Sequence, residues 1–582
     1  MRDSDPTGQA TKRAQCSNGW IAAGIFLLVM AIYVLSSPGR IDTIDGQARY
    51  EVAYNWLLEG RPVIRDPALG GIRGRNDLRY SYYGPAGSVA GMPFARLGML
   101  TDDPPGETSR FMFSLVCAFL GALVSVILFL FYLELGIPIR PALAWTFVSA
   151  FATMLWPAST SSLDNAQHAF FVILALYLAF LSAKRNSLAL AAVGGLVAGV
   201  LLLYQEYLMV LIPALAIATL GSTQTERTIG DSNCKGESSS SRALFGVRLK
   251  RAVQDVSDAL RWVWQTASAK ESHRRFLLFL ASNAVGAALC LMYHKFRFGS
   301  IFTNSKLAIA ARAHVKIFGN PVAGGLTILA SPGKSIFLYS PVLVIGLWGF
   351  SGLRRRYPHL ATAIAASSIL LVSFISCISF AGGDWCWGPR YLVPLLPLWA
   401  LAFPFASAKS RLRRYVMVAV LSAGFIVQGL ALSVEHQRYL FGKAVNDHFW
   451  AEDEWFYFKH SALFARPGEA LSLKDGVPLT AQIFKPPPLS ESVTYTIFGP
   501  PPPRRLAPIW MRQFRVFYLP RPWPLWMWTL PPERRPINLE AVLGGLLGSA
   551  VLGYAFITRG MQALESGGAP QEVKSEEKVV CP

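Results

Sequence analysis

Long apolar runs, separated by short polar segments, dominate residues 19–433, and one more run follows near residue 540. A run of about 20 apolar residues spans a bilayer as a helix, because only an internally hydrogen-bonded backbone is stable in hydrocarbon. The sequence therefore predicts about twelve membrane-spanning helices. We place them at residues 19–37, 111–133, 142–156, 167–183, 188–204, 207–221, 276–293, 336–352, 361–380, 391–406, 415–433 and 537–557.

Composition agrees with an all-α polytopic membrane protein, because 52% of the residues are hydrophobic and only 15% are charged. The first run is expected to stay as an anchor, since no small-x-small cleavage site follows it at good spacing. Lysine and arginine collect in alternate short loops, which predicts that both termini are cytoplasmic and that the protein lies in the inner membrane.

This topology divides the chain into five parts. They are a cytoplasmic N-terminus (1–18), a transmembrane core (19–433), a proline-rich outer region (434–536), a last helix (537–557) and a cytoplasmic tail (558–582). The core contains a first outer loop (38–110), an inner loop (222–275) and another outer loop (294–335). The density of proline in the outer region excludes long helices there.

The net charge of +20 does not require a nucleic acid partner. Basic loops orient a membrane protein and attract anionic lipids, which explains the charge without any further ligand. The seven cysteines show neither a disulfide framework nor a Cys/His spacing typical of a zinc site.

Ionisable residues beside membrane spans are costly, so their positions carry information about function. In the predicted topology they concentrate at the outer ends of spans and in outer loops. They are Asp42, Asp45, Asp164, His168, Glu206, Lys295, Arg297, Lys334, Asp384 and Arg390. This concentration indicates a reaction centre at the outer surface.

Asp42 and Asp45 directly follow the first span, in the stretch "GRIDTIDGQARYEVAYNWLLEG". Apolar positions behind them predict an amphipathic helix over about residues 47–59, lying along the membrane. Asp45 then has two interpretations. It is either the N-cap of that helix, with Asp42 in a turn, or a functional carboxylate.

The segment "IDGQARYEVAYNWLLEG" resembles the first outer loop of GT-C class membrane glycosyltransferases, especially the protein mannosyltransferase and lipid A aminoarabinose transferase group. Asp45, Arg49 and Tyr50 fall on the acidic motif of that group, while Gly46 replaces its second acid. The segments "RYSYYGPAGSVAGMPFARLG", "YHKFRFGSIFTNSK" and "GGDWCWGPRYLVPLLPL" are also similar to segments of such proteins.

The resemblance implies a polyprenyl-phosphate sugar donor, and an acceptor that is a glycan, a lipid or a protein. It implies direct displacement at the anomeric carbon with inversion, with Asp45, or alternatively Asp42, as general base. No cofactor is implied. Two close carboxylates can also bind a divalent cation, which is the less favoured arrangement.

Many relatives have a Lys-Pro-Pro where this chain has "YYGPAG", and that lysine is expected to meet the phosphate. A guanidinium or an ammonium group elsewhere must then replace it. Candidates for binding the substrate and its phosphate are Arg49, Tyr50, Arg79, Tyr83, Lys295, Arg297, Lys334, Asp384, Trp385 and Arg390.

Several of these candidates also fit structural roles. The side chain of Arg390 could simply extend its charged group to the membrane–water interface, and Lys295 and Arg297 could be solvated in an outer loop. The tryptophans of "DWCWGPRY" fit an aromatic belt as well as a sugar pocket. Two other classes remain open: a transporter or lipid-linked sugar flippase, and a GT-C-like scaffold without activity. A transporter is expected to carry ionisable groups near the midplane and an internal repeat, and the sequence shows neither.

Overall fold

The computed structural model describes most of the core and little of the long loops. It describes residues 6–66, 69, 71–101, 107–221, 270–304, 306–307, 316–383, 386–408, 410–434, 456, 458, 461–472 and 539–567. Most of the inner loop at 222–275 and of the proline-rich region at 434–536 therefore lies outside the described residues. Asp384 and Trp385 lie outside them too.

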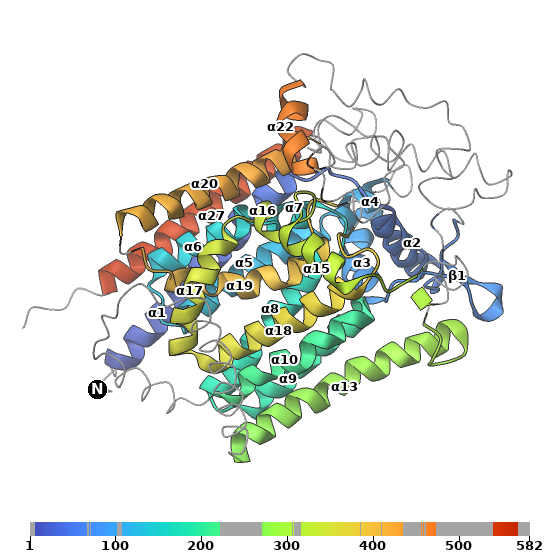
Figure 1. Ribbon diagram of the computed structural model, residues 1–582, viewed down its shortest axis with the longest axis horizontal. Coiled ribbons are helices and arrows are strands. Elements are labelled where there is room, and N and C mark those ends of the chain that lie inside the picture. The colour runs from blue at the N-terminus through green and yellow to red at the C-terminus, as the bar shows by residue number, and fades with distance from the viewer. Residues whose placement is uncertain are drawn as a thin grey trace, which may run out of the picture.

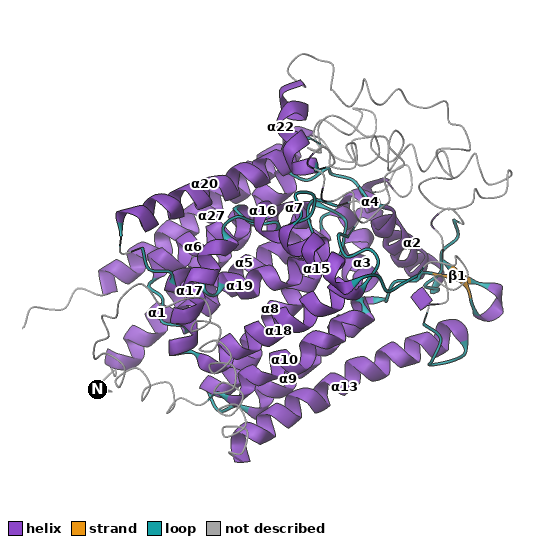
Figure 2. Ribbon diagram, in the orientation of Figure 1, coloured by secondary structure: helices purple, strands orange, loops and turns teal. Residues whose placement is uncertain are grey.

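The described chain is mainly helical (Figure 2). Seven of its helical stretches are long and apolar enough to cross a membrane. They lie in α1 (Pro6–Leu35), α4 (Glu107–Ser114) with α5 (Val116–Glu134), α8 (Asn165–Lys184), α13 (Lys270–Phe298), α18 (Pro358–Cys377), α20 (Arg411–Ser433) and α27 (Leu539–Gly567). The chain is thus a multi-pass membrane protein.

The other predicted spans form shorter or interrupted helices. They are α6 (Ile139–Phe151), α9 (Leu188–Tyr204), η3 (Glu206–Leu211) with α10 (Ile212–Ala216) and η4 (Ile217–Leu220), α16 (Ile336–Tyr339) with α17 (Leu343–Arg356), and η5 (Arg390–Leu395) with α19 (Leu396–Ala400) and η6 (Phe403–Phe405). Prolines such as Pro213, Pro394 and Pro397 interrupt them, because proline lacks the amide hydrogen that continues a helix. The count of about twelve spans stays a prediction.

The central helices α5 and α8 pack against each other and are surrounded by the remaining helices (Figure 1). The last helix, α27, packs along α1, although the two lie at opposite ends of the sequence. The Trp20 and Phe556 rings meet edge to face there, with their centroids 4.8 Å apart. At the edge of the bundle, α13 packs along α9.

The first outer loop folds into a small unit at one end of the bundle (Figure 1). It contains α2 (Ile44–Glu59), an antiparallel pair of strands, β1 (Ile72–Arg73) and β2 (Arg79–Tyr80), and α3 (Ala86–Met99). α2 packs against both α3 and α4, which places the residues after the first span over the ends of the core helices. The short helices η2 (Arg75–Asp77), α7 (Leu155–Thr160), α15 (Pro321–Ala330) and α22 (Ala462–Ser472) complete the described elements.

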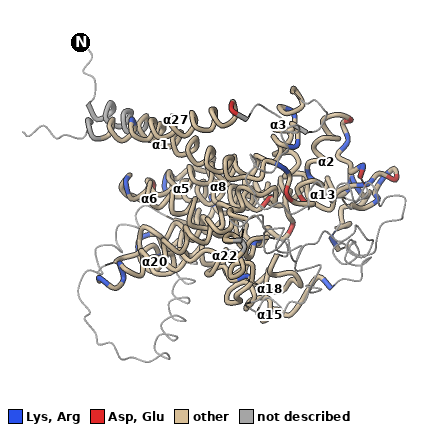
Figure 3. Tube along the Cα trace, turned by 90° about the horizontal axis from the view of Figure 1, so that it is seen from above, with Lys and Arg blue, Asp and Glu red and all other residues tan. Residues whose placement is uncertain are grey.

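Charged residues are unevenly distributed between the helix bodies and the helix ends. In the view of Figure 3 they gather near helix ends and around α2 and the neighbouring end of α13, while the helix bodies are mostly uncharged. The end that carries α2 contains acidic and basic residues together. This is the only described part of the chain in which several sequence-predicted site residues meet.

Candidate functional site

Asp45 does not cap α2. The helix begins at Ile44, earlier than the predicted residue 47, and its N-cap is Thr43, whose hydroxyl accepts a hydrogen bond from the Gly46 amide at 3.1 Å. Asp45 therefore lies in the first turn. The N-cap interpretation of Asp45 is wrong because "DTID" offers three residues with good capping side chains, and the threonine takes the position. Its carboxylate is left available for other contacts.

Ser162, in the segment before α8, fixes the start of α2. Its amide donates to Asp42 Oδ1 at 2.7 Å and its hydroxyl also contacts that oxygen, while the Thr43 hydroxyl lies 3.0 Å from the Ser162 hydroxyl. Gly46 makes this approach feasible, since a Cβ there would collide with the Ser162 side chain. This explains why Gly46 stands where the GT-C motif has its second acid.

Asp164 lies two residues further along and holds α2 at a second point. Its Oδ2 forms an ion pair with Arg49 Nη2 at 2.7 Å, and His168 Nε2 lies 3.2 Å from the same oxygen. Both charged side chains are buried, with 3% of Arg49 and 7% of Asp164 exposed. Burial alone would raise the pKa of Asp164, but the positive charge of Arg49 lowers it below its usual range. The pair is therefore ionised.

Arg390 contacts Asp45, although the two residues are 345 positions apart in the sequence. Its Nη1 lies 3.4 Å from Asp45 Oδ2, and each side chain is 19% exposed. Tyr83 forms a hydrogen bond to Asp45, and its ring lies under the Arg49 guanidinium at 4.2 Å. Burial and the charge of Asp45 raise the pKa of Tyr83 well above its usual value, so its hydroxyl keeps its proton.

The segment that leads to Arg390 is a tight loop. Gly383 and Gly388 both adopt positive φ, at 76° and 66°. The buried Lys334 donates from Nζ to the carbonyl oxygens of Cys386 at 2.8 Å and Gly388 at 3.3 Å. Lys334 thus positions this loop, which explains its burial without a phosphate.

We expect Gly388→Ala to lower the free energy of unfolding by roughly 1–3 kcal/mol, because a left-handed backbone and crowding both disfavour the added Cβ. That atom would lie 2.7 Å from Met154 Sδ and 2.9 Å from the Tyr339 ring. Unfolding of the detergent-solubilised protein, followed by tryptophan fluorescence, measures the change. Gly429→Ala is the matched control, since a Cβ at Gly429 meets nothing within 4 Å. Equal unfolding of both variants would contradict the expected strain.

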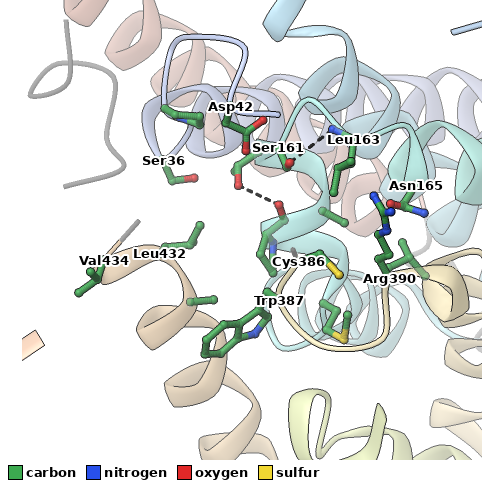
Figure 4. A pocket seen from close by; sticks show the side chains of 17 residues that line it. Ser36, Asp42, Ser161, Leu163, Asn165, Cys386, Trp387, Arg390, Leu432 and Val434 are labelled. Atoms are coloured by element: carbon green, nitrogen blue, oxygen red, sulfur yellow. Dashed lines mark hydrogen bonds between the residues drawn. The ribbon is translucent and has the colours of Figure 1, made fainter. Parts of the chain in front are cut away.

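A pocket opens between the end of α1, the turn before α2, the segment 154–165, the loop 386–393 and the end of α20. Figure 4 shows Asp42 and Arg390 reaching it from different sides, with Trp387 on a third. Trp387 is 6% exposed and packs edge to face against Tyr339 at 4.9 Å. Trp387 therefore lies inside the protein at the pocket and not in an aromatic belt, whereas Trp385 lies outside the described residues.

Other sequence-predicted candidates lie apart from Asp45. Arg297 is fully buried and donates to the carbonyl oxygens of Ser81 at 2.6 Å and Tyr83 at 3.3 Å, which holds the loop that carries Tyr83. Tyr50 is buried and donates to Ser109 Oγ at 3.0 Å. Arg79 is half-buried in β2 and Lys295 is exposed on α13, and the structure gives neither a contact with Asp45 among the described residues.

The structure brings near the site residues to which the sequence alone assigns no role there. Asp164 and His168 stood out only as ionisable residues beside a span, whereas the structure pairs Asp164 with both Arg49 and His168. Lys306 contacts Gln205 Oε1, and its Nζ lies 3.8 Å from Glu206 Oε2. Nothing in the local sequence distinguishes Lys306 from the other basic residues of its loop.

Among the described residues, Asp42 and Asp45 do not belong to a group of three side chains arranged to hold a metal ion. One such group occurs in the described chain, formed by Glu206, Cys290 and His294. Among the described residues, Asp42 and Asp45 therefore have no third side chain beside them that would complete a metal site.

No family model matches the sequence, and neither does any curated protein. Solved structures do match. ArnT from Cupriavidus metallidurans bound to undecaprenyl phosphate is 13% identical, with a TM-score of 0.43, over 93% of this chain and 78% of that chain. The oligosaccharyltransferase AglB from Archaeoglobus fulgidus, in complex with an inhibitory peptide and a dolichol-phosphate, is 14% identical, with a TM-score of 0.40, over 75% and 59%.

An oligosaccharyltransferase structure from the same archaeon, tethered to an acceptor peptide, is matched over 58% of its own length, so this chain spans less than two thirds of it. These structural neighbours, ArnT and AglB, are both GT-C glycosyltransferases. They include the aminoarabinose transferase group to which the first outer loop is similar.

Proposed function

We propose that this chain is an integral membrane glycosyltransferase that moves a sugar from a polyprenyl-phosphate donor to an acceptor at the outer face of the inner membrane. One observation carries the proposal. The Asp45 carboxylate lies 3.4 Å from the Arg390 guanidinium, beside a pocket that Arg390 and Asp42 line. This pair supports the proposal because a carboxylate can act as proton acceptor and a guanidinium can bind a phosphate.

The chemistry assigns one role to each group. The acceptor hydroxyl gives its proton to Asp45 as its oxygen bonds to the anomeric carbon. The bond from that carbon to the phosphate oxygen breaks, and the electron pair leaves with the polyprenyl phosphate. Arg390 stabilises the charge that grows on this phosphate, because a guanidinium matches phosphate geometry with two hydrogen bonds. Attack opposite the leaving group inverts the anomeric centre.

Asp45 is preferred over Asp42 because of their different contacts. Asp42 Oδ1 already accepts from the amide and the hydroxyl of Ser162, which commits that carboxylate to holding the segment before α8. Asp45 Oδ2 lies 3.4 Å from Arg390 Nη1, which is longer than the 2.7 Å between Asp42 Oδ1 and the Ser162 amide. A donor phosphate competes with Asp45 for Arg390, so binding of the donor would release the base for its task.

Arg49 supports this arrangement from inside the protein. It is neutralised by Asp164 at 2.7 Å, yet its Nη1 has no hydrogen-bond partner among the described residues. Arg49, Arg390 and Asp45 also influence one another electrostatically. We assign the direct phosphate contact to Arg390, and to Arg49 the task of holding α2, which carries Asp45, against Asp164.

Transfer from a lipid-linked donor tests the proposal. The purified protein is reconstituted in vesicles that contain undecaprenyl phosphate carrying a labelled pentose or hexose, with a total membrane extract of lipids, glycans and proteins as acceptor. Release of undecaprenyl phosphate, together with label on a new acceptor, is the expected result. Label that crosses the bilayer while it is still on its lipid indicates a flippase. Label that stays intact and in place indicates an inactive scaffold. Either outcome contradicts the proposal.

A further inference from the structure

Three metal-ligating side chains meet where α13 approaches η3, away from the Asp45 pocket. Glu206 is the first residue of η3, and Cys290 and His294 lie one turn apart on α13. His294 Nε2 lies 3.4 Å from Glu206 Oε1 and 3.7 Å from Cys290 Sγ. The ligand atoms of all three lie within 4.8 Å of one another.

These distances match those between the ligands of one tetrahedral ion. Zinc lies about 2.3 Å from sulfur and about 2.0–2.1 Å from nitrogen or oxygen. At tetrahedral angles this places nitrogen about 3.4 Å from oxygen and about 3.6 Å from sulfur. The two distances from His294 Nε2 have nearly these values, and the ligand atoms of Glu206 and Cys290 lie within 4.8 Å of each other, so an ion can enter after a small movement of the side chains.

The surroundings of the cluster orient its ligands. His294 Nδ1 lies 2.8 Å from the Thr303 carbonyl oxygen, which can only accept a hydrogen bond. Nδ1 therefore carries the hydrogen when the ring is neutral, and the Nε2 lone pair faces Glu206 and Cys290. Such a hydrogen bond from the second ring nitrogen to a backbone carbonyl is typical of metal-bound histidine. Lys306 lies beside the other carboxylate oxygen, Glu206 Oε2, at 3.8 Å.

We propose that Glu206, Cys290 and His294 bind a zinc-class divalent ion. Thiolate and imidazole ligands favour Zn²⁺ over Mg²⁺ or Ca²⁺, which prefer oxygen. The Cys290 thiol loses its proton to solvent as its sulfur bonds to the ion. The thiolate and the carboxylate then balance the two positive charges. Three protein ligands leave the fourth position of the ion to water.

The ion would fasten α13 to η3 and so to the rest of the core. α13 lies at the edge of the bundle, packed along α9 (Figure 1). Glu206 directly follows Gln205, whose Nε2 lies 3.5 Å from Asp164 Oδ2. The site therefore ties the peripheral helix to the segment that contacts the Arg49–Asp164 pair. This inference stands independently of the proposed sugar transfer.

Cobalt binding to the purified full-length protein in detergent tests the site. After chelator treatment, Co²⁺ is titrated while absorption is recorded. The expected result is one tightly bound ion per chain, with a thiolate-to-cobalt charge-transfer band that Zn²⁺ abolishes by displacement. Cys290→Ser should remove the band and weaken binding by roughly 10–100-fold or more. Glu206→Gln keeps the side-chain volume and should also weaken binding.

Cys377→Ser is the matched control, because Cys377 is also a half-buried cysteine near a helix end but lies outside the cluster. It should bind Co²⁺ as the unmodified protein does. Size-exclusion chromatography and thermal unfolding check that each variant is folded. The inference is overturned if the folded Cys290→Ser variant keeps the band and the affinity, or if the unmodified protein binds no Co²⁺ through a thiolate.

Discussion

Asp45→Asn is expected to reduce the rate of sugar transfer by at least about 100-fold, because a general base contributes about 10²–10⁴-fold and asparagine cannot accept the proton. The fold should persist, since Thr43 caps α2 and Asp45 is part of a partly exposed ion pair. The vesicle assay measures kcat and KM for the donor. The loss should fall on kcat without a rise in KM, because removal of the carboxylate leaves Arg390 available to the phosphate.

Two further variants sharpen this test. Asp77→Asn removes an exposed carboxylate of the same outer loop, whose pair with Arg73 has side chains 69% and 75% exposed, and it should transfer sugar normally. Asp42→Asn keeps an oxygen that can accept from Ser162 but removes the negative charge that strengthens these hydrogen bonds, and it should lower stability more than kcat. If Asp42→Asn abolishes transfer while Asp45→Asn stays active, Asp42 is the base. If both remain active, the proposed mechanism is wrong.

Asp164→Asn is expected to destabilise the protein by about 3–5 kcal/mol, because it leaves the buried Arg49 guanidinium without its counter-charge. The effect should appear as a large fall in the denaturant midpoint, measured by tryptophan fluorescence in detergent. α2 should lose its second point of attachment, so transfer should fall as well. Asp77→Asn again serves as the matched control, since its ion pair is exposed to solvent.

A double variant separates the two contributions to this loss. Arg49→Met with Asp164→Asn removes both charges, so it should be more stable than Asp164→Asn alone. If the single variant unfolds at the midpoint of the unmodified protein, the pair contributes nothing measurable. In that case α2 is held by its contacts with Ser162 and by packing.

The sequence predicted that the protein crosses the membrane several times and that a helix follows the first span, because both features depend on local patterns. Apolar runs define α1, α8 and α18, and the residues after the first span form a helix as expected. Spans interrupted by proline were predicted less well. Apolar composition predicted one span at residues 207–221, whereas the structure has 3₁₀ and α turns in η3, α10 and η4, with Pro213 at the start of α10.

The partners within the site could not be predicted, since they depend on contacts distant in sequence. Asp45 and Arg390 are separated by 345 positions, and no local feature distinguishes Arg390 from Lys334 or Arg297. Each of these three cations lies at an outer helix end or loop in the sequence. Only the fold reveals that Lys334 and Arg297 hold loops through backbone carbonyls, while Arg390 meets the carboxylate.

The pairing of α1 with α27 has a consequence for how the protein is made. About 500 residues separate Leu35, the last residue of α1, from Leu539, the first of α27. At roughly 5–20 residues per second, synthesis of that length takes roughly 25–100 seconds. During this time the face of α1 that includes Trp20 must rest against lipid or an insertion factor. Although α1 enters the membrane well before α27, it is thus among the last helices to reach its final packing.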